Sequence, residues 1–564
     1  MMTAIHHPWP PDAYPVNSRT LRVRLHITDR RVRGVWAHYG DRYATTLSRT
    51  VPMTQVGEAE WADIWEVDLV SPSGRFRYVF EIQMADGSTL VLGRTGMGAD
   101  LLGEPFQYAQ ISARNTPTVP TWVADAVGYE IFPDRFFRDP AAKDPGRRLV
   151  PWDSRPGQST FFGGTLAGIR EKLSYLEDLG ISLIYLTPIF RAATNHRYDT
   201  EDYYTVDPLL GSVDDLVALV RDAHDRGMKV ILDAVFNHTS DRFFAFQEVC
   251  RLGKASRYWG WYFVDGDRVS TNPVNYRTFA NVIASMPKVN HAHPEAEAYF
   301  LDVATYWMDL AGIDGWRLDV ADEVDHAFWR KFRERVKAQN PEALVVGEVW
   351  HDPTPWLTGD QWDGAMNYLL REVLVDFFGR QRLSLPQFAR KVDGLLHSQT
   401  DPAITAGLNL VGSHDTPRIL TVLGDDPQRL LAVMAMLLTW VGIPLIYYGD
   451  EVGMKGEGDP ECRAGMEWPS PNQPPPLLVA IRRLIQIRRE HRALRTGSLV
   501  IDHELARRHH VFQYVRHGAN EDIIVTFNGS EDLWHQEPGR TTLFSTTTDS
   551  AGLAPGAVEI WQRG

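Results

Sequence analysis

The sequence predicts an α/β protein: a (β/α)8 TIM barrel with an N-terminal β-sandwich domain, a subdomain inserted after barrel strand 3 and a small C-terminal β domain. Two observations predict it. Eight short apolar runs in the middle of the chain are mostly separated by helix-length segments, which favours a parallel barrel. On either side, short runs alternate apolar and polar residues, as half-buried strands do. The predicted domains are 1–121, 122–495 with the insertion at 239–292, and 496–564.

The N-terminal region is predicted to be β structure because its apolar runs alternate and turn-forming residues, such as the Pro-Ser-Gly at 72–74, separate several of them. The runs lie at 20–27, 32–39, 64–70, 76–84 and 88–93. Short alternating strands of this kind are typical of a β-sandwich. We interpret residues 115–122 as the linker to the next domain.

The barrel prediction depends on apolar runs that begin at residues 127, 181, 229, 315, 343, 364, 407 and 443. Helical periodicity lies between many of them, as at 166–180 and 213–227. The region is longer than the about 250 residues typical of such barrels, and most of the surplus falls at 239–292 between the third and fourth strands. After about residue 496, β-like runs return at 510–517, 522–529 and 557–563 and predict the C-terminal domain.

Composition and charge narrow the classes of function. The 564 residues are 44% hydrophobic and 23% charged, as in soluble globular proteins, and an 11% aromatic content suits either sugar stacking or large cores. A net charge of −14 without a basic stripe argues against nucleic acid. No run is long and apolar enough for a bilayer, and the first residues lack a secretory signal. Cys250 and Cys462 have neither metal spacing nor the density of a disulfide scaffold, so we expect a cytoplasmic protein.

Polar side chains gather at the ends of the predicted barrel strands. They are Asp233, Asn237 and His238 on the third strand, Arg317, Asp319 and Glu323 on the fourth, Glu348, Trp350 and His351 on the fifth, His414 and Asp415 on the seventh, and His196, Tyr198 and Asp199 in the loop after the second. In a parallel barrel these positions meet at the C-terminal face, where active sites form. One such residue would most often be an end cap, but acids and histidines from several strands at one rim indicate a functional site.

The residue types favour acid–base chemistry on a sugar. The chain has no Ser or Cys nucleophile beside a base, no H-E-x-x-H and no glycine-rich phosphate loop. Histidines and acids could together hold a metal, and that alternative stays open. Carboxylates with Trp and Tyr are the equipment of a retaining glycosidase, whose two carboxyl groups lie about 5–5.5 Å apart. Because Arg317 shares a strand face with Asp319, we expect it to lower the pKa of Asp319 and keep that carboxylate ionised.

Eight motifs stand along the chain. They are YEIFPDRF (129–136), NHRYDTEDYY (195–204), DAVFNH (233–238), MPKVN (286–290), GWRLDVADEV (315–324), GEVWH (347–351), VGSHD (411–415) and GIPLIYYGDEVGM (442–454). Together they resemble the α-amylase superfamily, and within it the branch of cyclomaltodextrinases, maltogenic amylases and neopullulanases. The N-terminal domain also resembles the extra domain of that branch. The resemblance covers essentially the whole chain and implies a glycoside hydrolase.

The resemblance implies a role for each site residue. Asp319 becomes the nucleophile that forms a β-glucosyl-enzyme, Glu348 the general acid and then base, and Asp415 a third acid that binds sugar hydroxyls. The implied substrate-binding residues are His196, Tyr198, His238, Arg317 and His414 around the reacting glucose, and Glu323 and Trp350 on the acceptor side. Asp233 and Asn237 are interpreted as supports of the site.

Two positions depart from the branch. Asp322 stands where the branch usually has asparagine, which adds a negative charge beside the acceptor side and bears on the balance between hydrolysis and transfer. Thr165 in FFGGT (161–165) replaces an aspartate, and residues 136–145 lack an expected asparagine-rich run. These segments build a calcium site in several relatives. Since Thr165 removes a charged oxygen ligand, we expect no tight calcium site, and the mechanism requires no cofactor.

The expected substrates are α-glucan oligosaccharides: cyclomaltodextrins, maltooligosaccharides and, in addition, pullulan and starch, cut at α-1,4 bonds. A transglycosylase on the same scaffold, and a catalytically silent glucan-binding protein that would be expected to lose a catalytic acid, are the alternatives. The resemblance also implies a homodimer in which the N-terminal domain covers the partner's active site. Trp9, Trp36, Trp61 and Trp65 are available for that interface, although we expect Trp36 and Trp65 to fill the domain's own core.

Overall fold

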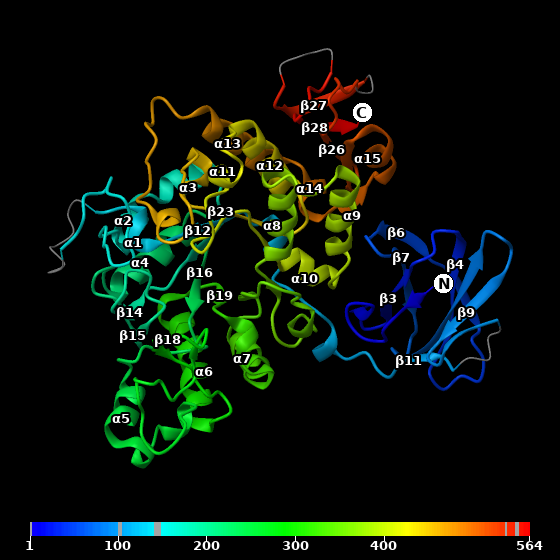
Figure 1. Cartoon of the computed structure of the whole chain (residues 1–564). Coiled ribbons are helices and arrows are strands. Elements are labelled where there is room, and N and C mark those ends of the chain that lie inside the picture. Colours follow the sequence, from blue (N-terminus) through cyan, green and yellow to red (C-terminus); the bar gives the residue numbers. More distant parts are fainter. Residues whose placement is uncertain (1–2, 100–103, 140–147, 536–538, 548–551, 564) are drawn as a thin grey trace.

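The computed structural model describes residues 3–99, 104–139, 148–535, 539–547 and 552–563. Its N-terminal β domain packs two antiparallel sheets around one apolar core (Figure 1). One sheet has the order β1-β3-β7-β6 with β2 beside β3, and the other the order β10-β9-β8-β4-β5 with β11 beside β8. The strands are β1 (Ala4–Ile5), β2 (Ala13–Asn17), β3 (Thr20–Ile27), β4 (Val32–Gly40), β5 (Arg49–Pro52), β6 (Thr54–Glu58), β7 (Asp63–Val70), β8 (Phe76–Met84), β9 (Thr89–Gly93), β10 (Gly96–Gly98) and β11 (Phe106–Tyr108).

The alternation of side chains along these strands decides which tryptophans enter the core. Trp65 is buried there, as predicted. The prediction for Trp36 is wrong. In β4 the core face carries Val35 and Ala37, so the period of two puts Trp36 on the opposite face, where its ring covers Gly34. A β-carbon at Gly34 would lie 2.6 Å from that ring, which explains the glycine.

The eight predicted barrel strands all form, and they pair in parallel in the order β21-β20-β19-β16-β13-β12-β23-β22. A single parallel bridge between Met366 and Leu408 joins the two ends of this row and nearly closes the barrel. The strands are β12 (Gly128–Ile131), β13 (Leu183–Leu186), β16 (Lys229–Ala234), β19 (Gly315–Leu318), β20 (Leu344–Gly347), β21 (Gly364–Ala365), β22 (Leu408–Asn409) and β23 (Ile443–Tyr447). Burial on both faces explains their near-continuous apolar runs.

Helices follow most of the barrel strands and cover the outside of the barrel (Figure 1). They are α1 (Pro133–Phe136), α2 (Leu166–Glu171), α3 (Leu173–Leu179), α4 (Val213–His224), α6 (Pro294–Ala311), α7 (His326–Gln339), α8 (Tyr368–Leu374), α9 (Leu385–Leu396), α10 (Asp401–Ala406), α11 (Ile419–Val422), α12 (Pro427–Thr439), α13 (Pro476–Glu490) and α14 (Arg492–Thr496). The periodic segment 166–180 forms two helices instead of one, because the backbone of Lys172 leaves helical geometry between α2 and α3.

The insertion after β16 and the C-terminal domain complete the chain. The insertion contains α5 (Phe244–Leu252) and the hairpin of β17 (Thr278–Phe279) and β18 (Ile283–Pro287), and a second hairpin, β14 (Phe190–Ala192) with β15 (Thr200–Val206), follows β13. The C-terminal sheet has the order β24-β25-β26-β28-β27. Its elements are β24 (Ser498–Ile501), α15 (His503–His509), β25 (Val511–His517), β26 (Asp522–Asn528), β27 (Arg540–Ser545) and β28 (Val558–Arg563).

Three parts of the chain meet at Asp393 in α9. Its Oδ2 accepts the backbone N–H of Glu58 in β6 at 2.7 Å and lies 2.7 Å from His503 Nε2 in α15. Its Oδ1 lies 3.3 Å from His397 Nδ1. A β-carbon at Gly57 would lie 2.9 Å from this carboxylate, so the close approach of β6 requires glycine. We call Asp393, His397, His503 and Glu58 the junction cluster.

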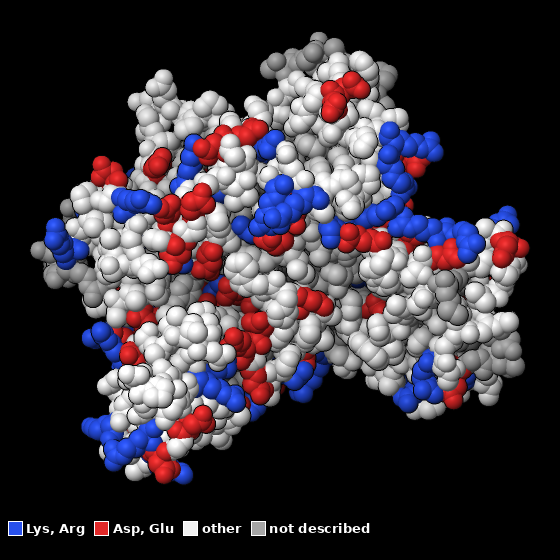
Figure 2. All heavy atoms as spheres, in the orientation of Figure 1, with Lys and Arg blue, Asp and Glu red and all other residues white. Residues whose placement is uncertain are grey.

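No helix in the described part of the chain is long and apolar enough to cross a membrane. On the face shown in Figure 2, basic side chains lie among acidic ones instead of forming one large basic surface.

Candidate active site

The three predicted catalytic acids lie just past the C-terminal ends of parallel barrel strands. Asp319 follows β19 directly, Glu348 follows β20 directly, and Asp415 lies in the loop after β22. Asp319 and Glu348 are 5% and 6% exposed. The parallel register therefore brings together residues that are far apart in the sequence.

Arg317 stands at the centre of a carboxylate cluster. This side chain is fully buried, and its Nη1 lies 2.8 Å from Asp319 Oδ1 and 3.0 Å from Asp233 Oδ1. Its Nη2 lies 2.9 Å from Glu348 Oε2. One guanidinium thus faces three carboxyl groups, which we call the Arg317 cluster. Tyr185 and Tyr198 also donate their hydroxyls to Asp233 Oδ2, at 2.6 and 3.1 Å, and so fix this carboxyl group beside Arg317.

The expectation that Arg317 would lower the pKa of Asp319 is only half right. Burial raises the pKa of Asp319 well above its usual range, and Arg317 opposes that rise without cancelling it, because Glu348 and Asp233 repel the same negative charge. The two oxygens of Asp319 also differ. Oδ1 contacts Arg317, whereas Oδ2 is buried and has no hydrogen-bond partner in the described part of the chain. A buried carboxylate oxygen without a partner is rare in structural sites.

Val320, between the nucleophile candidate and the next helical turn, has a strained backbone. Its φ of 44° lies in the left-handed region, which β-branched residues rarely adopt. This conformation aims its backbone N–H at Glu348 Oε2, 2.9 Å away, while Glu348 Oε1 accepts the indole N–H of Trp350 at 3.1 Å. Strain of this kind is typical of functional sites, and it fixes Glu348 relative to Asp319. No signal in the sequence marks Val320.

Asp415 and His414 form a second charged group at the barrel mouth. Asp415 Oδ2 lies 3.0 Å from His414 Nε2, and Asp415 Oδ1 accepts from Arg463 Nη2 at 3.1 Å. Partial desolvation opposes its charge, but His414 and Arg463 lower the pKa of Asp415 below its ordinary value. Asp415 and Glu130 in turn raise the pKa of His414 to about 10, although its ring is fully buried. The sequence analysis missed Glu130 and Arg463.

Two further histidines are kept neutral by burial. Burial lowers the pKa of His196 to about 3 and that of His238 to about 4. His196 stacks on Tyr198 with ring centroids 5.8 Å apart, and Tyr198 stacks on His414 at 5.3 Å. His238 Nε2 lies 3.1 Å from the Tyr198 carbonyl oxygen. The predicted substrate-binding residues His196, Tyr198, His238 and His414 therefore form one connected wall.

The predicted acceptor side is more exposed than this wall. Trp350 is 49% exposed and stacks on Tyr368 with ring centroids 3.8 Å apart, which makes a flat platform suited to a sugar ring. Glu323 pairs with Lys288 at 3.1 Å. Asp322, which stands where the branch usually has asparagine, lies 3.0 Å from His351 Nε2, so the imidazole of His351 is a partner for its negative charge.

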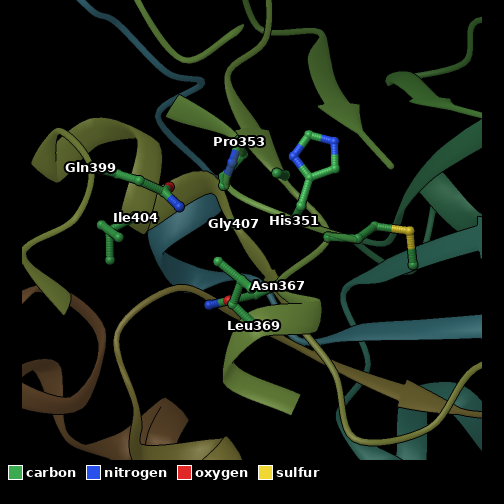
Figure 3. A pocket seen from close by; sticks show the side chains of 9 residues that line it. His351, Pro353, Asn367, Leu369, Gln399, Ile404 and Gly407 are labelled. Carbon is green, nitrogen blue, oxygen red and sulfur yellow. The ribbon is translucent and has the colours of Figure 1, made fainter. Parts of the chain in front are cut away.

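A small pocket lies beside this side of the site (Figure 3). Its lining includes His351, Asn367 and Met366, whose sulfur lies 3.3 Å from Arg317 Nε. Its volume of about 10 Å³ holds at most one water, so it cannot be a sugar subsite.

The structure also bears on the metal alternative. Among the described residues, no group of three or more His, Cys, Asp or Glu side chains is arranged to hold a metal ion. Thr165 caps α2 by accepting the Gly168 N–H at 3.0 Å. Asp134 accepts the backbone N–H groups of Phe162 and Gly163, at 3.0 and 3.1 Å, so this segment is held by a protein carboxylate. Part of the altered calcium-type segment, 140–147, lies outside the described residues.

A parallel barrel with a cluster of acids at its C-terminal face is an arrangement that suits a glycoside hydrolase. Residues 130–470 match the family described as "Alpha amylase, catalytic domain", and residues 1–112 match "Alpha amylase, N-terminal ig-like domain". The chain therefore belongs to the α-amylase family.

Curated relatives and solved structures agree. The chain is 42% identical to a cyclomaltodextrinase of Geobacillus thermopakistaniensis (strain MAS1) over 544 residues, 94% of this chain and 91% of the relative. It is 40% identical to neopullulanase 2 of Thermoactinomyces vulgaris over 521 residues, 92% of this chain and 89% of the relative. A solved cyclomaltodextrinase structure matches with a TM-score of 0.90 and 35% identity, covering 100% of this chain and 98% of that one. The predicted family, fold class and enzyme class are confirmed, and the chain is an α-glucan hydrolase.

Proposed function

We propose that this enzyme hydrolyses α-1,4-glucosidic bonds by double displacement, with Asp319 as nucleophile and Glu348 as acid and base. The observation that carries the proposal is the asymmetry of Asp319: Oδ1 is fixed by Arg317, and Oδ2 has no partner among the described residues. Glu348 lies against the other nitrogen of the same guanidinium. Two carboxyl groups held on one guanidinium suit the about 5–5.5 Å separation of a retaining pair.

In the first step, Asp319 Oδ2 attacks the anomeric carbon while Glu348 gives its proton to the leaving oxygen. Glu348 is held in place for this step, because Arg317 Nη2 and the Val320 backbone N–H contact its Oε2 and the Trp350 indole N–H contacts its Oε1. In the second step, Glu348 takes a proton from water, and the hydroxide displaces Asp319 and restores the original configuration.

The remaining site residues bind and orient the sugar. Asp415 stays ionised beside His414 and accepts hydroxyl hydrogen bonds from the glucose at the reacting position. The neutral rings of His196 and His238 exchange hydrogen bonds with the sugar without repelling a developing positive charge on the ring. Trp350 and Glu323 receive the leaving glucan on the acceptor side, where Asp322 modulates its polarity. The mechanism uses no metal or other cofactor.

The substrates we propose are cyclomaltodextrins and maltooligosaccharides, with pullulan and starch in addition. Relatives named cyclomaltodextrinase, neopullulanase and maltogenic α-amylase support this range. Transfer of the glucosyl unit to a sugar is the second candidate, because Asp322 alters the charge beside the acceptor. A product time-course on β-cyclodextrin, pullulan and soluble starch, with and without added glucose, separates the two. If longer transfer products dominate when glucose is added, transfer and not hydrolysis is the main reaction of the enzyme.

The same reactions test the mechanism. Proton NMR in the first minutes should show new reducing ends as the α-anomer, because two displacements retain configuration. Initial β-anomer would mean an inverting enzyme and would remove the nucleophile role from Asp319. No cleavage of any of the three glucans would contradict the proposed function as a whole.

We also propose a cytoplasmic homodimer formed through the N-terminal domain. Trp9 and Trp61 of that domain are 58% and 52% exposed, whereas Trp65 is buried. A site covered by a partner's domain would favour small rings over bulky starch. Light scattering on a Trp9→Ser/Trp61→Ser variant should show a smaller assembly, with Tyr43→Ser, another exposed aromatic of the same domain, as the control. A monomeric wild-type protein that prefers starch would exclude this arrangement.

A further inference from the structure

Glu130 is a buried acid at the barrel mouth to which the proposed mechanism gives no step. It lies within β12, is fully buried, and its Oε1 is 2.6 Å from His414 Nδ1. The same oxygen accepts the backbone N–H of His414 at 3.2 Å. Its Oε2 has no hydrogen-bond partner in the described part of the chain. A fully buried carboxylate with one free oxygen is costly, so it needs a reason beyond anchoring a loop.

Hydrogen bonding around His414 requires protons on both ring nitrogens. Nδ1 faces the Glu130 carboxylate, which only accepts. Nε2 faces Asp415 Oδ2 at 3.0 Å and the Tyr198 hydroxyl oxygen at 2.6 Å. Tyr198 already donates its hydroxyl proton to Asp233, so toward His414 it accepts. Three acceptors around one ring fit an imidazolium and neither neutral tautomer.

We propose that Glu130 is a positioning residue that holds His414 as a permanent imidazolium, and that His414 in turn holds Asp415 ionised and oriented toward the sugar. The charges then alternate in one row: Glu130, His414, Asp415 and Arg463, with the last pair 3.1 Å apart. His414 itself is fully buried, whereas the Asp415 side chain is 31% exposed. The imidazolium therefore acts on the substrate through Asp415. This inference rests on the proposed function, in which Asp415 binds sugar hydroxyls.

The other groups packed around His414 are consistent with a ring that is protonated on both nitrogens. The titratable and charged groups that face it are Glu130 on β12, Asp415 on its own loop, Tyr198 and His196 on the loop before β15, Asp233 on β16, and Cys462 and Arg463 after β23. Cys462 and Arg463 donate to the His414 carbonyl oxygen, at 3.3 and 2.7 Å, so they fix the backbone and leave the ring free of further donors. In agreement, Asp415 and Glu130 raise the pKa of His414 to about 10.

The variant Glu130→Gln separates charge from shape. Its amide oxygen can still accept from Nδ1 and from the backbone N–H, so a purely structural role would survive. Glu451→Gln is the matched control, because Glu451 is a fully buried glutamate after the neighbouring strand β23 that bonds Tyr129 and Tyr175 instead of His414. Circular dichroism and thermal unfolding establish that both variants fold.

Two measurements carry the test. Carbon-13 NMR of the histidine Cε1 positions, with the His414 signal assigned, should show wild-type His414 doubly protonated at pH 8 and the Glu130→Gln ring titrating at least about one pH unit lower. Between pH 7 and pH 9, kcat/KM on β-cyclodextrin should fall at least about twofold more in Glu130→Gln than in wild type or Glu451→Gln.

The outcomes are distinct. A neutral His414 at pH 8 in the wild-type protein would overturn the proposal without any variant. An unchanged His414 titration in Glu130→Gln, or a kcat/KM lowered by one factor at every pH, would reduce Glu130 to a structural anchor. A wild-type protein that cleaves no glucan would instead contradict the proposed function, while the NMR titration would still decide the state of His414.

Discussion

Asp319 in the Arg317 cluster and Asp393 in the junction cluster are equally hidden from solvent, at 5% and 3% exposed, yet their surroundings differ in kind. Asp393 has a partner for each oxygen: a backbone N–H and His503 on Oδ2, and His397 on Oδ1. Asp319 has one fixed oxygen and one without a hydrogen-bond partner in the described part of the chain. Asp393 therefore links three parts of the chain through both of its oxygens, whereas Asp319 uses only one oxygen in a hydrogen bond with a described residue.

The pKa values of the two acids move in opposite directions. Burial raises the pKa of both, but hydrogen bonds from His397 and His503 bring the pKa of Asp393 below its ordinary value. Around Asp319 the neighbouring carboxyl groups Glu348 and Asp233 add to the effect of burial, and its pKa stays well above the usual range. The folded state therefore stabilises the charge of Asp393 and opposes the charge of Asp319.

The largest expected effect is that of Asp319→Asn on activity. The amide keeps the shape but cannot attack the anomeric carbon, so we expect kcat to fall about 10⁴-fold or more. Unfolding in urea should show unchanged or slightly increased stability, because one like charge leaves the Arg317 cluster. Retention of more than about a tenth of wild-type kcat, a barrier change of only ~1.4 kcal/mol, would remove Asp319 from the nucleophile role.

Asp393→Asn should show the reverse behaviour. It weakens charged hydrogen bonds to two histidines in the junction cluster, so we expect the free energy of unfolding to fall by about 2–4 kcal/mol. At a temperature where the variant remains folded, kcat should change by less than about twofold, because among the described residues the contacts of Asp393 are with Glu58, His397 and His503 and with none of the acids of the barrel mouth. The comparison fails if Asp393→Asn loses activity while keeping its stability.

Part of this contrast was predictable from the sequence. Alternation and the strand–helix repeat predict the sandwich and the barrel, and the motif residues Asp319, Glu348 and Asp415 come to one rim because parallel strands share an end. Each of these inferences uses the local pattern of a strand or its end. Trp36 shows the limit of such patterns: its strand is predicted correctly, but which face meets the second sheet depends on packing.

Contacts between distant segments were not predictable. Glu130 meets His414 across 284 residues, and Asp393 meets Glu58 across 335, with nothing in either local sequence to indicate a partner. The pKa of Asp319 depends on the same long-range information. The neighbour two residues away, Arg317, was visible in the sequence, but the competing carboxyl groups Asp233 and Glu348 reach it only in the folded barrel.

A smaller effect is expected on the pH dependence of stability, where the contribution of the Asp393 charge can be measured. Because the pKa of Asp393 is lowered in the folded state, its contribution is present above the unfolded value of about 3.9 and is lost as pH falls through the folded pKa. Urea unfolding of wild type and Asp393→Asn at a series of pH values should therefore give stabilities that converge in acid below about pH 4. A difference that persists unchanged to pH 2 would mean that the charge of Asp393 contributes nothing.

The smallest expected effect is that of a chelator. It follows from a feature that the Arg317 cluster and the junction cluster have in common. Both surround buried carboxylates with cationic or hydrogen-bonding side chains: Arg317 occupies the centre of one, and His397 and His503 flank the acid of the other. A divalent ion would have to displace these partners to reach the carboxylates. In the segment 161–165, where the family resemblance raises the question of calcium, Thr165 contributes no carboxylate and serves as a helix cap instead. Excess EDTA should therefore change kcat and the melting temperature little, with kcat within about twofold of the untreated enzyme. Activity that disappears in EDTA and returns with calcium or zinc would show that a metal takes part, and would restore the metal interpretation of the histidines at the barrel mouth.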